Sequence, residues 1–138
     1  MKVMVIVKGS EKYEAGALPD EALLAKMGQY NEELVKAGIM QAGEGIHPSS
    51  KGYRIQYTDS KPKVIDGPFT EAKELVAGFW IWKVKSMDEA LDWAKRAPFA
   101  PGDAIELRPV FEAEDFGEEL TPELREKEEQ LRARMEKK

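Results

Sequence analysis

Runs of apolar residues along the chain predict four core strands. Val3 to Val7 is apolar at every position, so we expect a strand that is covered on both faces. Further strands are predicted from Ile39 to about Glu44, over residues 77–84 and over residues 104–111. Gly and Pro mark loops between these segments, such as residues 43–52, which are rich in Gly, Pro and Ser.

Two amphipathic helices are expected between these strands. The first begins at Pro19 or Asp20 and ends before Gly38, a typical C-capping residue. Its apolar stripe consists of Leu23, Leu24, Met27, Tyr30, Leu34 and Val35. The second follows Ser86 as N-cap, with Glu89 three residues later to close a capping box. Its apolar face consists of Ala90, Leu91, Trp93 and Ala94.

Residues 53–58 and 62–66 form two extended runs that a polar turn separates, which predicts an inserted β-hairpin. Tyr53, Ile55 and Tyr57 alternate with polar residues, so one face of this hairpin is expected to contact water. The full order is strand, helix, strand, hairpin, strand, helix, strand. The chain therefore fits an α+β class, ferredoxin-like βαββαβ fold with a hairpin insertion.

The predicted sheet has more apolar surface than its two helices can cover. Residues on 77–84 split between the faces, with Phe79 and Ile81 on one and Trp80, Trp82 and Val84 on the other. Two helices cover only one face of a four-stranded sheet, yet both faces are apolar. The economical partner is a second copy of the chain, so we expect a homodimer with its sheets face to face.

The composition changes after Phe111, which divides residues 1–112, the ferredoxin-like domain, from residues 113–138. The second part holds an acidic connector and a terminal helix with Thr121 as N-cap and Pro122 at its first position. The apolar stripe of this helix is thin, with Leu124, Leu131 and Met135. Such a helix is expected to dock on a neighbouring surface, either of its own chain or of a partner chain.

Composition and charge narrow the classes of function. A net charge of −5 argues against nucleic acid as a partner. The chain has no cysteine, so thiol nucleophiles, disulfides and zinc–thiolate sites are excluded. The apolar run Val3 to Val7 is too short for a signal peptide or a membrane span, so we expect a cytoplasmic protein that does not enter a membrane.

The segment "DGPFTEAKEL", preceded by "GEGIHPSSKG" and followed by "GFWIW", resembles the DGPF-domain proteins of the YCII-related family. The resemblance runs from the first strand to about residue 125. It implies a dimeric α+β barrel and assigns no activity, although related proteins are often encoded beside extracytoplasmic-function sigma factors. Enzymes of the wider superfamily carry a His–Asp pair with the His near the first strand. "MKVMVIVKGS" has no His, so that assignment does not carry over.

His47 is the only histidine and therefore the natural candidate for acid–base chemistry near neutral pH. Asp66 could orient it if the hairpin returns close to it, and Glu44 precedes it. The structural alternative is a loop histidine, with Asp66 bonded to the backbone of its own turn. A metal would find one His and carboxylates alone, so we expect no metal site and no other cofactor.

Polar residues after the DGPF turn and on the last strand are candidate ligand contacts. Thr70, Glu71 and Lys73 could edge a polar pocket or form a solvated charge run. Glu106 and Arg108 share one face of their strand, where Arg108 could bind an anion or the two could join an ion pair, for instance with Lys83.

The sequence thus predicts a homodimer that binds a small polar or anionic metabolite, with cofactor-free proton transfer or elimination as the chemistry if it is an enzyme. Whether it is an enzyme stays open. The alternative is a non-catalytic regulatory or protein-interaction module, in a sigma-factor-linked stress or signalling context, whose connector and terminal helix contact a partner protein.

Overall fold

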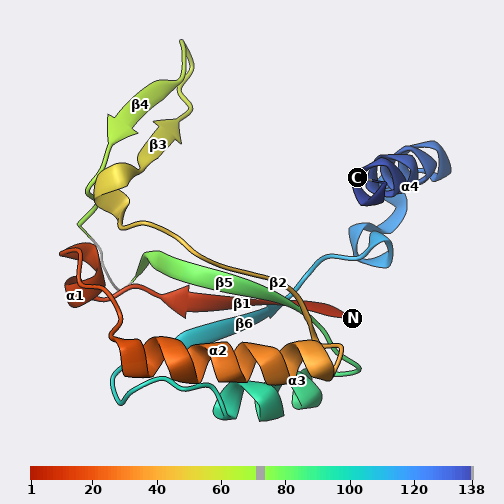
Figure 1. Ribbon diagram of the computed structural model, residues 1–138. Coiled ribbons are helices and arrows are strands. Elements are labelled where there is room, and N and C mark those ends of the chain that lie inside the picture. The colour runs from red at the N-terminus through yellow and green to blue at the C-terminus, as the bar shows by residue number, and fades with distance from the viewer. Residues whose placement is uncertain (71–73, 138) are drawn as a thin grey trace.

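The computed structural model of the chain describes residues 1–70 and 74–137. Its centre is an antiparallel sheet of β1 (Lys2–Lys8), β2 (Met40–Gly45), β5 (Val76–Lys83) and β6 (Ile105–Pro109) in the order β2-β5-β1-β6. The helices α2 (Glu21–Lys36) and α3 (Met87–Lys95) cover one face of this sheet (Figure 1). The arrangement is the ferredoxin-like α+β fold that the sequence predicts.

The hydrophobic core lies between the sheet and its two helices. Alternation along the strands directs Val3 and Val5 of β1 and Trp80 and Trp82 of β5 toward the helices, and all four are buried. Leu34 of α2 is among the residues that complete this core. The predicted division of β5 is confirmed, because Phe79 and Ile81 are only partly buried and lie on the other face.

Side-chain caps fix where the two helices begin. The Asp20 carboxylate accepts a hydrogen bond from the backbone N–H of Leu23 at 2.8 Å, as expected for the start of α2. The Ser86 hydroxyl accepts from the N–H of Glu89 at 3.2 Å. The Glu89 carboxylate accepts from the N–H of Lys85 at 2.9 Å, so it closes one residue earlier than in a standard capping box.

The face of the sheet opposite the helices is not covered by any helix of the described chain. Its residues come in cross-strand pairs, with Met4 opposite Ile81 and Ile6 opposite Phe79. All four are partly exposed. We call this surface the open face. A second sheet over it is still a prediction, since the structure contains one chain.

Two arms project from the body on the side of the open face (Figure 1). The hairpin arm consists of β3 (Tyr53–Gln56) and β4 (Lys63–Asp66), after the short turn η1 (Ser49–Lys51). The C-terminal arm contains η3 (Ala113–Glu119) and α4 (Pro122–Glu136), and every residue of α4 is exposed.

The structure corrects three details of the sequence reading. The hairpin has no dry face within one chain, because it stands off the body and only Ile65 of its strands is partly buried. Leu91, predicted on the apolar face of α3, is 42% exposed, since it lies about 100° around the helix from the buried Ala90. A single-turn helix, α1 (Glu11–Glu14), occupies the segment expected to be a loop.

None of the helices in the described part of the chain combines the length and apolar character that a membrane crossing requires.

Candidate functional site

A cavity of about 840 Å³ opens between the start of α2 and one end of the sheet, the end next to α1. Its wall on the helix side includes Leu23 and Met27, and its wall on the sheet side includes Val7 and Trp80. Most of its lining is apolar, as in binding sites for small molecules, which usually enclose roughly 300–1,000 Å³. The cavity is therefore the principal candidate site.

Two polar side chains on its wall are held by hydrogen bonds. The Asn31 carbonyl oxygen accepts from the indole N–H of Trp80 at 2.9 Å, which satisfies a donor that is almost fully buried. The Tyr13 hydroxyl donates to the Ala77 carbonyl at 3.3 Å. Burial, and then the nearby Glu14 carboxylate, raises the pKa of Tyr13, so this phenol stays protonated as a donor.

The loop from Ile46 to Lys51 separates this cavity from a smaller one. Ile46, His47, Pro48 and Lys51 line both cavities. The second measures about 390 Å³ and lies toward the hairpin and the DGPF turn, where Phe69 and Arg54 line it. The Arg54 guanidinium lies 3.9 Å from the ring centroid of Phe69, within cation–π range. His47 and Lys51 therefore stand where an apolar cavity meets a more polar one.

Ser49 connects this loop to both α1 and the DGPF turn. Its backbone N–H donates to the Glu14 carboxylate at 3.0 Å, and its hydroxyl also hydrogen bonds to Glu14. The same hydroxyl accepts from the N–H of Phe69 at 3.0 Å. The N–H of Gly67 donates to the Gly52 carbonyl at 2.9 Å, and the Gly67–Pro68 peptide is cis. This corner, the DGPF turn at residues 66–69, thus fixes the position of the His47 loop.

Of the predicted site residues, His47 and Glu44 line the larger cavity. Asp66 ends β4 opposite Tyr53, is exposed, and makes no hydrogen bond or ion pair with His47. Neither Asp66 nor Thr70 is among the described residues that line the two cavities. Glu71 and Lys73, predicted at the rim, lie outside the described residues.

Glu106 and Arg108 lie together on the open face and away from both cavities. Their register places Glu106 opposite Ile6 and Arg108 opposite Met4. The Glu106 carboxylate is 3.7 Å from the Arg108 guanidinium and 3.9 Å from the Lys8 ammonium group. An ion pair is thus present, with Lys8 in the place suggested for Lys83.

Five cavity or loop residues were not singled out from the sequence. They are Tyr13, Glu14, Asn31, Ser49 and Lys51. Tyr13 and Glu14 sit in what reads as a loop, and Asn31 is a polar residue within the predicted apolar stripe of α2, four residues after Met27. Only the Ser10 N-cap, which accepts from the N–H of Tyr13 at 3.1 Å, could have revealed α1.

Metal ligands are not gathered at this site. Across residues 1–70 and 74–137, no group of three or more His, Asp or Glu side chains is arranged to hold a metal ion. The polar groups at the junction of the cavities are suited to hydrogen bonding and to charge pairing with an organic ligand.

Comparison with known proteins assigns a family to this fold. The chain is 30% identical over 76 residues to an uncharacterized protein of Rhizobium meliloti (strain 1021), which covers 55% of this chain and 61% of that relative, less than two thirds of its length. A solved structure of 5-chloro-2-hydroxyhydroquinone dehydrochlorinase from Burkholderia phenoliruptrix AC1100, in complex with 2,5-dihydroxybenzoquinone, is similar with a TM-score of 0.44 at 19% identity, over 83% of this chain and 98% of that one. The model of the YCII-related domain matches residues 1–114, and the chain therefore belongs to the YCII-related domain family.

Proposed function

We propose that this protein binds a small molecule with an apolar body and a polar or anionic end in the larger cavity. The observation that supports this most is that the lining changes from apolar to polar along the cavity. Its inner wall is apolar, with Met27 and Trp80, and its boundary with the smaller cavity carries His47 and Lys51. An apolar lining with a few convergent polar groups is typical of a ligand site.

The polar end of the ligand would be recognised at the junction of the cavities. Lys51 supplies a cation and His47 supplies a ring that can donate or accept a hydrogen bond. In this arrangement His47 is also the group that would move a proton, which requires no cofactor. Asp66 is proposed to act on His47 only indirectly, because it belongs to the corner that positions the loop.

We also propose that two copies associate through the open face. Met4, Ile6, Phe79 and Ile81 remain partly exposed there, and burying them against a second sheet would remove this surface from water. The Glu106–Arg108 pair would lie within or beside that interface, and Arg108 is then proposed to serve the dimer rather than a ligand. Sedimentation equilibrium tests this directly, and a monomer at micromolar concentration would refute it.

A pair of matched probes tests the binding site. 1-Naphthoate has an aromatic body and a carboxylate, and 1-naphthalenemethanol keeps the body without the charge. We expect saturable binding of 1-naphthoate, with a shift of the indole N–H signal of Trp80 in NMR spectra, because Trp80 lines the cavity. The signal of Trp93, which does not line it, serves as the internal control.

Substitutions at the junction of the two cavities test whether the carboxylate of the ligand is bound there. His47→Gln with Lys51→Gln should weaken the binding of 1-naphthoate by at least about tenfold, since a charge-assisted hydrogen bond contributes roughly 1.5–3 kcal/mol. The affinity for the neutral alcohol should change little. The control Lys26→Gln, on the exposed side of α2, should change the affinity for neither probe. Absence of saturable binding would refute the proposal and favour the interaction module. An equal loss of affinity for both probes would refute the proposal that the junction recognises the polar end of the ligand.

A further inference from the structure

Both arms carry large apolar side chains that nothing in the described chain covers. On the hairpin arm, Tyr57 is 81% exposed, and Tyr53, Ile55 and Val64 are also exposed. On the C-terminal arm, residues 111–137, Phe111 is 67% and Met135 70% exposed. The others on that arm are Phe116, Leu124 and Leu131. Such surfaces normally mark an interface.

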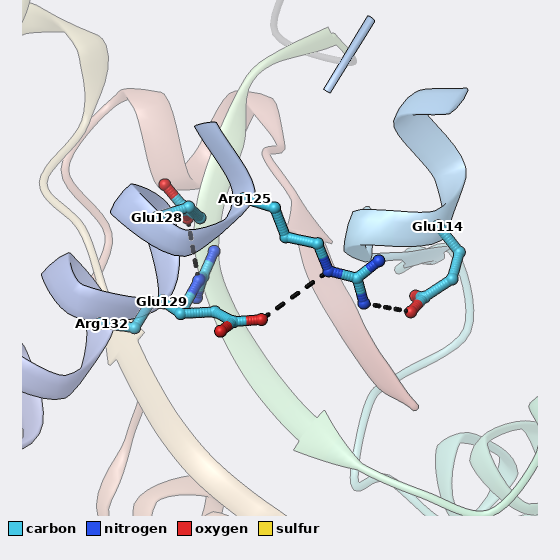
Figure 2. Close-up of polar contacts among 5 residues, drawn as sticks. All are labelled: Glu114, Arg125, Glu128, Glu129 and Arg132. Carbon is cyan, nitrogen blue, oxygen red and sulfur yellow. Dashed lines mark hydrogen bonds and ion pairs between the residues drawn. The ribbon is translucent and has the colours of Figure 1, made fainter. Parts of the chain in front are cut away.

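The C-terminal arm is held in shape by its own contacts. The Arg125 guanidinium on α4 lies 2.9 Å from the Glu114 carboxylate of η3 and 3.7 Å from Glu129 (Figure 2). The rings of Phe111 and Phe116 stack with centroids 5.0 Å apart. The arm therefore presents a formed surface rather than a loose tail.

The two arms carry opposite charge. Residues 53–66 hold three cations, namely Arg54, Lys61 and Lys63, against two carboxylates. Residues 111–119 hold five carboxylates and no cation. Aromatic side chains accompany both sets. A contact between the two arms would combine apolar burial with charge pairing, whereas a contact between identical arms would place like charges together.

The arms also sit at opposite ends of the sheet, so they do not meet within one chain. The hairpin leaves the sheet beyond Gly45, which pairs with Gly78. The C-terminal arm leaves beyond Pro109, which pairs with Val3 near the other end of β1 (Figure 1). A second chain placed on the open face by a two-fold axis that exchanges these ends would bring each hairpin arm to the partner's C-terminal arm.

We infer that the two arms exchange between copies, with the hairpin arm of one protomer packed against the C-terminal arm of its partner. This inference rests on the proposed dimer through the open face. Two-fold symmetry makes the contact twice, once at each end of the paired sheets. The hairpin also has the necessary reach, because the four residues of β3 span about 10 Å, residues 57–61 continue beyond them, and stacked sheets lie only about 10 Å apart.

Spin labelling across the dimer tests which arms meet. Because the natural chain has no cysteine, Ser60→Cys at the hairpin tip gives a single attachment site for a nitroxide. Labelled chains are mixed with isotope-labelled wild-type chains, so that broadening reports only contacts between chains. We expect broadening of signals from residues 111–137. Broadening of residues 53–66 instead, or of neither arm in an intact dimer, would overturn the inference.

Charge reversal supplies an independent measurement. Lys61→Glu with Lys63→Glu should weaken dimerisation about tenfold, as should Glu118→Lys with Glu119→Lys, because each lost ion pair contributes up to about 1 kcal/mol. Combining all four substitutions should restore most of the affinity in sedimentation, and additive losses would overturn the arm exchange. A monomeric wild-type chain would also overturn it, together with the proposed dimer. Titration with 1-naphthoate remains a separate readout of the ligand site.

Discussion

Gly67 of the DGPF turn is the position at which the structure makes its sharpest prediction. A Cβ atom added at Gly67 would overlap the carbonyl oxygen of Ser49 and lie 2.7 Å from the carbonyl carbon of the same residue. The carbonyl oxygen of Gly52 would be 3.2 Å away. These are backbone atoms, so no side chain can rotate to make room. Gly67→Ala must therefore separate the corner from η1.

The cost follows from what that separation breaks. Overpacking at a closely packed site costs typically 1–3 kcal/mol. Moving the corner also weakens two hydrogen bonds, from Gly67 N–H to the Gly52 carbonyl and from Phe69 N–H to the Ser49 hydroxyl, each contributing roughly 0.5–1.5 kcal/mol. We expect Gly67→Ala to lower the free energy of unfolding by about 2–4 kcal/mol.

Urea unfolding followed by tryptophan fluorescence measures this change, with Gly28→Ala as the matched control. Gly28 lies within α2 and a Cβ there meets nothing within 4 Å, so the same substitution should stabilise by about 0.5–1 kcal/mol. The two variants thus differ in sign. A Gly67→Ala protein within about 0.5 kcal/mol of wild type would refute the close packing of the corner on Ser49, because surface changes stay within that range.

Three further changes test the surroundings of the site. Burial raises the pKa of Tyr30 from 10.0 to about 12, so its protonated phenol stabilises the fold fully below about pH 10 and loses that contribution, of about 2–3 kcal/mol, as the pH rises to 12. Urea unfolding at about pH 8 and 11 should show about half of this loss, roughly 1.4 kcal/mol, in wild type. The Tyr30→Phe variant, which has no phenol to donate the 2.6 Å hydrogen bond to the Trp93 carbonyl, should not show it, and an equal loss in both proteins would contradict the prediction. Asn31→Ala leaves the buried Trp80 indole N–H unpaired and should cost about 1–3 kcal/mol, whereas Asn31→Asp keeps an acceptor. Ser49→Ala should lower the affinity for 1-naphthoate at least several-fold, because it releases the His47 loop. An unchanged affinity would contradict that role of Ser49.

The elements of the fold could be predicted because their signals are local. Alternation in β5 separates Trp80 and Trp82 from Phe79 and Ile81, and caps such as Asp20 mark helix starts, so both survive without tertiary context. Helix α1 could not be predicted in this way. It has one turn and no buried residue, and long-range bonds from Tyr13 and Glu14 hold it in place.

The site was only partly predictable for the same reason. His47 is conspicuous as the single histidine, and the structure places it at both cavities. Ser49 and Glu14 are 35 residues apart, and nothing near either one signals their contact. That Asp66 makes no hydrogen bond with His47 depends on where the hairpin lies relative to the body (Figure 1), which a pattern of alternation does not specify.

The DGPF turn can serve the ligand site without touching a ligand. Gly67 lets the corner pack on Ser49, and Ser49 in turn ties the His47 loop to Glu14 and hence to α1. A substitution at the corner should therefore change stability and ligand affinity together. A substitution of His47 or Lys51, which are exposed and line the cavities, should change affinity with little effect on stability. If Gly67→Ala lowers stability and leaves the affinity for 1-naphthoate intact, the DGPF turn serves only the stability of the fold. If stability and affinity fall together, the turn also positions the His47 loop for ligand binding.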